Sequence, residues 1–214
     1  MRLRWFGHAC FELVFDNGTV IVTDPFDASV GYPLPDVRAT AVTSSHDHFD
    51  HNYVEGVKGD PQVIKGVGRY RVGGVDIKGI ASFHDANRGQ ERGENTIFVF
   101  DDGNLKVAHL GDLGHELTAS QLDLLGPVDV LLIPVGGFYT IGPEEAANVV
   151  ESIKPKVVIP MHFKTEAIDF PIAPVDDFLA AMGINGRKIQ ANWVEIDPKD
   201  LEEEMVIYVL KYQD

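Results

Sequence analysis

The sequence contains a single cysteine, Cys10, among its 214 residues. An internal disulfide is therefore excluded, which suits a reducing compartment, and we expect a cytoplasmic protein. The sequence also lacks any run of roughly 20 apolar residues, the length that a membrane-spanning helix needs. Its N-terminal stretch places His8 and Glu12 where a signal peptide has unbroken apolar residues. We therefore expect neither membrane insertion nor removal of a leader.

Positive charge is scarce as well. The chain has 18 lysines and arginines against 33 aspartates and glutamates, which gives a formal net charge of −15. This balance argues against a broad binding surface for nucleic acid or anionic membranes, so we expect a small-molecule substrate. A chain of 214 residues with 44% hydrophobic content is long enough for one sizeable core. We expect one domain over residues 1–214, with a homo-oligomer as an open alternative.

Secondary-structure signals change near the middle of the chain. The first half contains short, partly alternating apolar runs, and turn sequences at 16–18 and 101–104 predict β-hairpins. Further along, amphipathic helical segments alternate with apolar strands, and Thr118 and Pro143 are the expected helix starts. This order predicts an α/β (α+β) protein with two mixed β-sheets face to face and helices outside, a four-layer αββα sandwich. The acidic run at 201–204 is interpreted as a solvated turn.

The stretch SSHDHFDH, residues 44–51, concentrates three histidines and two aspartates in eight positions. Such groups are poor core formers, and the pattern H-x-H-x-D-H has a mechanism as a set of metal ligands. Side chains alternate in an extended loop, so His46 and His48 can converge on one ion while Asp50 and His51 face a second. The competing interpretation is a hydrated loop that is rich in turn-forming residues.

Further ligand candidates follow predicted strands elsewhere in the chain. His84 closes GIASFH, Asp112 ends HLGD, and His162 ends VVIPMH. Each could be an ordinary polar residue at a strand end, but two adjacent ions need ligands from distant segments, and these three share the required position. His109 and His115 are expected to have structural roles, because strand alternation directs His109 away from Asp112.

Five short motifs follow the order found in a known superfamily: VTDPF, SSHDHFDH, ASFH, HLGD and IPMHF. On these residues the chain resembles the metallo-β-lactamase superfamily along nearly its whole length. The stretches GHACFEL, GGFYTIGPEEA and IPMHF further resemble a branch of small metal-dependent hydrolases that includes ascorbate-6-phosphate lactonase. The resemblance implies the metallo-β-lactamase fold.

The resemblance also implies roles for individual residues. It assigns three ligands to a first metal ion, three to a second, and a bridging carboxylate: His46, His48 and His84; Asp50, His51 and His162; and Asp112. Asp50 and Asp112 would be catalytic, and a hydroxide held between two divalent ions would be the nucleophile. Asp24 would orient ligand imidazoles from outside the metal sites. Imidazole and carboxylate ligands suit zinc or manganese.

Several other residues keep two interpretations each. His8 is either a hydrogen-bonded core histidine or a contact to substrate or to the ligands. Tyr139 either lines the substrate pocket or packs in a tight turn. Lys164 either binds an anionic group of the substrate or stays solvated, and the same alternatives apply to Arg88 and Arg92.

Together these features predict a metal-dependent hydrolase that acts on a small ester, lactone or phosphoester. The alternatives are a non-catalytic metal- or ligand-binding protein and a nucleotide phosphodiesterase. A di-iron redox protein of the same superfamily is a further alternative. Such proteins typically resemble H-x-E-x-D-H, whereas this chain has His48 at the variable position and no flavin domain.

Overall fold

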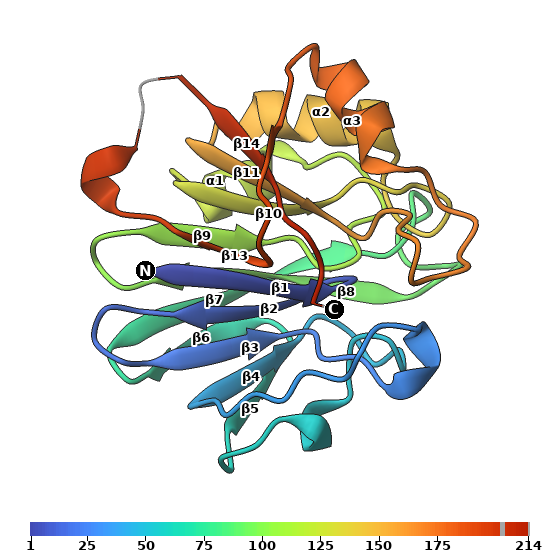
Figure 1. The fold of residues 1–214 in the computed structure, drawn as a ribbon. Helices are drawn as coiled ribbons and strands as arrows, with labels where there is room; N and C mark the ends of the chain where they lie inside the picture. Colours follow the sequence, from blue (N-terminus) through green and yellow to red (C-terminus); the bar gives the residue numbers. More distant parts are fainter. Residues whose placement is uncertain (202–203, 214) are drawn as a thin grey trace.

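The computed structural model describes residues 1–201 and 204–213, in which two β-sheets pack face to face (Figure 1). The first sheet has six strands in the order β13-β1-β2-β3-β4-β5. Their bounds are Arg2–Gly7 for β1, Cys10–Val14 for β2, Val20–Thr23 for β3, Ala41–Ser44 for β4, Gln62–Lys65 for β5 and Trp193–Glu195 for β13. The acidic run expected to form a turn lies partly outside the described residues, at positions 202 and 203.

The second sheet has eight strands in the order β12-β14-β11-β10-β9-β8-β7-β6. Their bounds are Gly68–Val72 for β6, Val75–Phe83 for β7, Glu94–Asp101 for β8, Lys106–His109 for β9, Val130–Pro134 for β10, Val157–Met161 for β11, Arg187–Lys188 for β12 and Val206–Val209 for β14. Strands β6 to β9 pair antiparallel, and β9, β10, β11, β14 and β12 pair parallel.

Both sheets are mixed, as predicted. In the first sheet, β13, β1, β2 and β3 pair antiparallel, whereas β3, β4 and β5 pair parallel. The turns at 16–18 and 101–104 join β2 to β3 and β8 to β9, which confirms both predicted hairpins. In the second sheet the antiparallel pairs come before β9 and the parallel pairs after it, which follows the change of pattern along the sequence. In the first sheet β3, β4 and β5 already pair parallel before that change.

Three α-helices in the described residues lie against the second sheet (Figure 1). They are α1 Ala119–Leu125, α2 Pro143–Ile153 and α3 Val175–Met182. Thr118 accepts a hydrogen bond from the backbone of Gln121 and α2 starts at Pro143, so both predicted helix starts are confirmed. The outer face of the first sheet is covered by loops and by the 3-10 helices η1 Ala28–Val30 and η2 Val54–Gly56. None of the helices in the described range is long and apolar enough to cross a bilayer.

The apolar pattern of each strand matches its place in the sandwich. Strands β10, VLLIP, and β11, VVIPM, are buried at all five positions. Parallel strands that are covered on both faces have this continuous apolar character. Strand β7 begins with alternation instead, because Val75 and Ile77 are buried while Asp76 between them is exposed.

The C-terminal segment contributes to both sheets. Strand β13 pairs with β1, with Val194 opposite Leu3, and closes one edge of the first sheet. Strand β14 pairs with β11 in the second sheet, and β12 pairs with β14 at its edge. Figure 1 shows this red segment passing from one sheet to the other. The N-terminal strand is therefore held on both sides, by β2 and by β13.

Two glycines permit close backbone approach where the strands end. A Cβ atom on Gly114 would lie 2.3 Å from the backbone nitrogen of Asp85 and 2.4 Å from the carbonyl carbon of His84. A Cβ atom on Gly136 would lie 2.3 Å from the carbonyl oxygen of His162. Any other residue would push these backbones apart, so the ends of β7 and β11 depend on glycine at both positions.

Replacement of Gly114 with alanine is expected to destabilise the protein by about 1–3 kcal/mol, because the added methyl group collides with backbone atoms that cannot rotate away. Gly142→Ala is the matched control, since the nearest atom to its Cβ would be 3.7 Å away. The measurement is the free energy of unfolding in urea for both variants. Equal losses for the two variants would contradict the close-approach argument.

Candidate metal centre

Side chains from several separate segments meet at one edge of the sandwich. His46, His48, Asp50 and His51 lie in the loop after β4, while one residue each comes from the ends of β7, β9 and β11. These three are His84, Asp112 and His162, so the structure brings all seven predicted ligand residues together. His8 from the β1–β2 turn and Asp24 after β3 lie with them.

One cluster consists of three histidines. One ring nitrogen from each of His46, His48 and His84 lies within 4.8 Å of the others. The ring centroid of His46 is 4.5 Å from that of His48 and 4.8 Å from that of His84. The two loop histidines therefore face a third from a different strand end. This trio is the set that the resemblance implies for a first metal ion.

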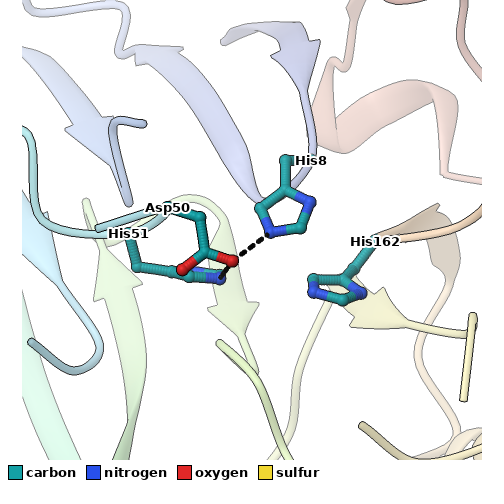
Figure 2. Close-up of side chains that lie close together, drawn as sticks. All are labelled: His8, Asp50, His51 and His162. Carbon is teal, nitrogen blue, oxygen red and sulfur yellow. Dashed lines mark hydrogen bonds and ion pairs between the residues drawn. The ribbon is translucent and has the colours of Figure 1, made fainter. Parts of the chain in front are cut away.

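A second cluster contains His8, Asp50, His51 and His162 (Figure 2). Figure 2 shows the four side chains facing one another, with Asp50 between His8 and His51. The Oδ2 atom of Asp50 lies 3.1 Å from His8 Nε2 and 3.7 Å from His51 Nε2. Three of these residues are the set implied for a second metal ion. His8, for which the sequence left two interpretations, is the fourth.

The Asp112 carboxylate lies between the two clusters. Its Oδ2 atom is 3.2 Å from His51 Nε2, 3.2 Å from His84 Nε2 and 3.4 Å from His162 Nε2. Burial alone would raise the pKa of Asp112, but His162 and His51 hold it well below its usual range. Asp112 therefore carries a negative charge that both clusters share.

Asp24 and Ser45 orient two of the imidazoles from behind. Asp24 Oδ2 accepts hydrogen bonds from the Ser45 hydroxyl and, at 2.9 Å, from His51 Nδ1. Because the hydroxyl proton goes to Asp24, Ser45 Oγ accepts from His46 Nδ1 at 2.9 Å. The Nδ1–H groups of both imidazoles then point away from the cluster, so that Nε2 of His46, and Nε2 of His51 once a metal ion replaces its second proton, could bind an ion in the cluster. The resemblance implied a supporting role of this kind for Asp24.

Three residues of the centre have left-handed backbone conformations. The φ angles are +51° for His8, +41° for Asp24 and +50° for His162. For residues other than glycine this conformation costs roughly 1–2 kcal/mol. The carbonyl oxygen of His8 accepts hydrogen bonds from the Trp5 indole at 3.0 Å and from the His162 backbone N–H at 3.1 Å, which hold two of these turns in place.

Burial keeps two imidazoles of the centre neutral, and the carboxylates of the centre favour added positive charge. Burial lowers the pKa of His46 to about 3 and that of His8 to about 4, so both rings are neutral at pH 7, the form that binds metals. Burial also acts to lower the pKa of His51, but the carboxylates of Asp112 and Asp50 raise it well above its ordinary value. The same carboxylates would favour a bound cation.

The donor set fits divalent metal ions. Within residues 1–201 and 204–213, His46 Nε2, His51 Nε2 and Asp112 Oδ1 are buried and have no hydrogen-bond partner. Leaving a buried polar atom unpaired costs about 1–3 kcal/mol, so three such atoms at one place indicate a missing partner. Imidazole nitrogens and carboxylate oxygens bind zinc, manganese and similar ions.

Two further predicted residues, Tyr139 and Lys164, contact Phe170 beside the second cluster. The ring of Tyr139 is 6.1 Å from that of Phe170, which in turn is 5.7 Å from the ring of His8. Lys164 Nζ donates to the carbonyl oxygen of Phe170 at 3.1 Å and lies 3.5 Å from Asp169. The ammonium group of Lys164 therefore holds the loop that carries Phe170.

The remaining two histidines, His109 and His115, belong to neither cluster and are bound by backbone groups. His109 Nε2 donates to the carbonyl oxygen of Ala9 at 2.8 Å, and its Nδ1 accepts from the Gly111 backbone at 3.1 Å. His115 Nε2 accepts a hydrogen bond from the Phe83 backbone at 3.2 Å. These contacts are those expected of the structural roles that were predicted for both residues.

Sequence reasoning missed three residues that shape the centre. Besides Ser45, these are Asn95, whose side-chain oxygen accepts from the Asp112 backbone at 2.9 Å, and Asp85. The Asp85 carboxylate accepts hydrogen bonds from four backbone N–H groups in the loop at 85–93. Asp85 opens the stretch DANRG, and an aspartate at the start of such turn-forming residues was a local signal for its role. The roles of Ser45 and Asn95 depend on contacts between distant segments and had no such signal.

Comparisons with known proteins agree with this geometry. Residues 2–162 match a family model described as a beta-lactamase superfamily domain. A UPF0173 metal-dependent hydrolase from Pyrobaculum islandicum is 33% identical over 208 residues, which cover 82% of this chain and 88% of the relative. A protein of the same name from Thermococcus onnurineus is 31% identical over 194 residues, covering 77% of this chain and 85% of the relative.

A crystal structure from Thermotoga maritima extends the likeness to the whole chain. That protein, a candidate zinc-dependent hydrolase of the metallo-β-lactamase superfamily, is 45% identical, with a TM-score of 0.83 and 99% of each chain covered. None of these three relatives is named as an ascorbate-6-phosphate lactonase, so that finer resemblance stays a prediction. The chain belongs to the metallo-β-lactamase superfamily and, within it, to the UPF0173 metal-dependent hydrolase family.

Proposed function

We propose that this protein is a hydrolase that uses two divalent metal ions to cleave a small ester, lactone or phosphoester. The observation that carries the proposal is the Asp112 carboxylate, which lies within 3.4 Å of histidines from both clusters. A carboxylate between two sets of imidazoles is the oxygen ligand that a pair of adjacent ions requires. The names of the relatives, which include metal-dependent and zinc-dependent hydrolases, support the same class of reaction.

In this proposal each cluster holds one ion, and Asp112 contributes to both. The ligands would be His46, His48 and His84 at the first site, and Asp50, His51 and His162 at the second. Bound zinc or manganese ions would supply Lewis acidity, which polarises a substrate oxygen and lowers the pKa of a water molecule. Zinc is the first choice, because the Thermotoga maritima relative is named for it.

The residues around the ligands would keep the centre in one geometry. Asp24 and Ser45 hold the protons of His46 and His51 on the nitrogens that face away from the centre. His8, neutral at pH 7, donates from Nε2 to Asp50 Oδ2 at 3.1 Å and holds that carboxylate. Ligands that cannot rotate need no reordering when substrate binds, which preserves the alignment for attack.

Metal content is the first test of the proposal. We expect about two zinc or manganese ions per chain in the parent, and a loss of roughly one of them in His48→Ala, which removes one imidazole of the first site. The measurement is elemental analysis after purification without chelator. His115→Gln serves as the control, because His115 lies outside both clusters, and it should retain the parent value. A parent that stays free of metal after reconstitution would refute the dinuclear centre.

Hydrolysis separates an enzyme from a binding protein. The metal-loaded parent is expected to hydrolyse at least one member of a panel of lactones, carboxylic esters, thioesters and phosphodiesters, and to lose activity in a chelator. Asp112→Asn should lower kcat by about 100-fold or more, because the charge shared by both clusters is removed. A metal-loaded parent that turns over none of the panel would instead support a non-catalytic ligand-binding protein. Activity confined to the phosphodiesters would support a nucleotide phosphodiesterase.

Asp24→Asn is expected to weaken metal binding by about 10- to 100-fold without changing any ligand. Asp24 Oδ2 accepts from His51 Nδ1 and the Ser45 hydroxyl, and Oδ1 accepts from the Ser45 backbone N–H. Asparagine carries an NH2 group in place of one of these oxygens, so one set of donors loses its acceptor and faces another donor. The measurement is zinc affinity in competition with a chromogenic chelator. Asp76→Asn, on the exposed surface of β7, is the control and should bind zinc like the parent. Unchanged affinity in Asp24→Asn would show that Asp24 does not position the ligands.

A further inference from the structure

A cavity of about 470 Å³ adjoins the first cluster, with His46 and His48 in its wall. A molecule bound in it would therefore lie next to the proposed first metal site. Two basic residues line the same cavity, Lys65 at the end of β5 and Arg92 in the loop at 85–93. The chain has a net charge of −15, so two positively charged side chains beside the candidate metal centre are unusual.

The charged groups of the two basic residues differ in the partners that they have in the structure. Lys65 Nζ donates to Asp47 at 2.8 Å, so its charge is paired. The Arg92 guanidinium makes one long ion pair with the exposed Glu91, at 3.6 Å, and donates no hydrogen bond within the described part of the chain. An arginine side chain has five N–H donors, and those of Arg92 are available to a ligand.

The backbone around Arg92 is held rigidly. Asp85, next to the proposed ligand His84, accepts hydrogen bonds from the backbone N–H groups of Glu91 at 3.0 Å and Arg92 at 2.8 Å. The backbone N–H groups of Asn87 at 2.8 Å and Gly89 at 2.9 Å donate to the same carboxylate. The loop therefore keeps one shape, and Arg92 lines the cavity.

The guanidinium also lies over the ring of Tyr139, beside the second cluster. Its central carbon lies 6.0 Å from the ring centroid of Tyr139, within the range of a cation–π contact. Tyr139 packs near Phe170, which lies against His8. Arg92 thus spans the opening from the cavity beside the first cluster to the aromatic side of the second. Arg88, in the same loop, is exposed and does not line the cavity.

We propose that Arg92 binds an oxyanion of the substrate, a carboxylate or a phosphate, and so selects anionic esters or lactones. This inference rests on the proposed hydrolase function. A guanidinium donates two parallel hydrogen bonds to a carboxylate or phosphate, which fixes the orientation of the bound group as well as its charge. The charge of Glu94, which also lines the cavity, is exposed to solvent and therefore screened. The anionic group would sit against Arg92, and the scissile bond would face His46 and His48.

A pair of esters of equal length tests the selectivity. The probes are 4-nitrophenyl butyrate and mono-(4-nitrophenyl) succinate, which differ by a terminal methyl group in place of a carboxylate. We expect the metal-loaded parent to prefer the succinate in kcat/KM, and Arg92→Gln to lower the succinate-to-butyrate ratio by roughly 10- to 100-fold. Arg92→Lys should retain part of the preference. Arg88→Gln, the matched control in the same loop, should keep the ratio of the parent.

Binding of inorganic phosphate, measured by calorimetry on the metal-loaded proteins, gives a second readout that needs no turnover. Loss of phosphate binding in Arg92→Gln but not in Arg88→Gln would assign a phosphate-bearing substrate, and loss of the succinate preference alone would assign a carboxylate.

Hydrolysis with an unchanged ratio and unchanged phosphate binding in Arg92→Gln would overturn the inference and leave the hydrolase intact. No hydrolysis with Arg92-dependent phosphate binding would overturn the hydrolase and leave an anion site. Equal unfolding midpoints for parent and variants exclude loss of the loop as the cause.

Discussion

The buried carboxylate of Asp112 is the group on which the rest of the centre depends. It lies at the end of β9, within 3.4 Å of imidazoles from three other segments of the chain. A buried charge is costly unless opposite charges or hydrogen-bond donors surround it. The Asp112 carboxylate therefore holds together four parts of the chain: the ends of β7, β9 and β11, and the loop after β4. The order of the second sheet, in which β9 lies between β8 and β10, brings these ends to the same edge.

The surrounding protein maintains this arrangement at a cost in backbone strain. His8, Asp24 and His162 have positive φ angles, and hydrogen bonds from neighbouring segments stabilise these turns. Asp24 and Ser45 determine which nitrogen of two imidazoles carries the proton. Strain and fixed tautomers of this kind are typical of sites that must be ordered before a ligand arrives. The rigid sandwich thus supplies a preorganised centre, and the loops around it supply recognition.

The family relationship concerns the fold, whereas the loops concern substrate recognition. The Thermotoga maritima protein resembles this chain over 99% of its length, so the two proteins share the sandwich fold. In the proposed hydrolase, substrate choice would belong to the surface around the strand ends, where the loop organised by Asp85 holds Arg92 near Tyr139. Aromatic and cationic groups from separate loops can change there without disturbing the buried carboxylates. One scaffold can therefore serve different substrates.

The sequence by itself determined the local features: the hairpins at 16–18 and 101–104, the helix starts at Thr118 and Pro143, and the loop with His46, His48, Asp50 and His51. These depend on turn residues, caps and alternation within a few positions. The tertiary structure alone decided the pairing of β13 with β1, the membership of His8 in the second cluster and the contacts of Ser45 and Asn95. It also separated Arg92 from Arg88, which the sequence could not distinguish. Each of these features depends on which distant segments the packed sheets bring into contact. No pattern within a few positions of the chain specifies those contacts.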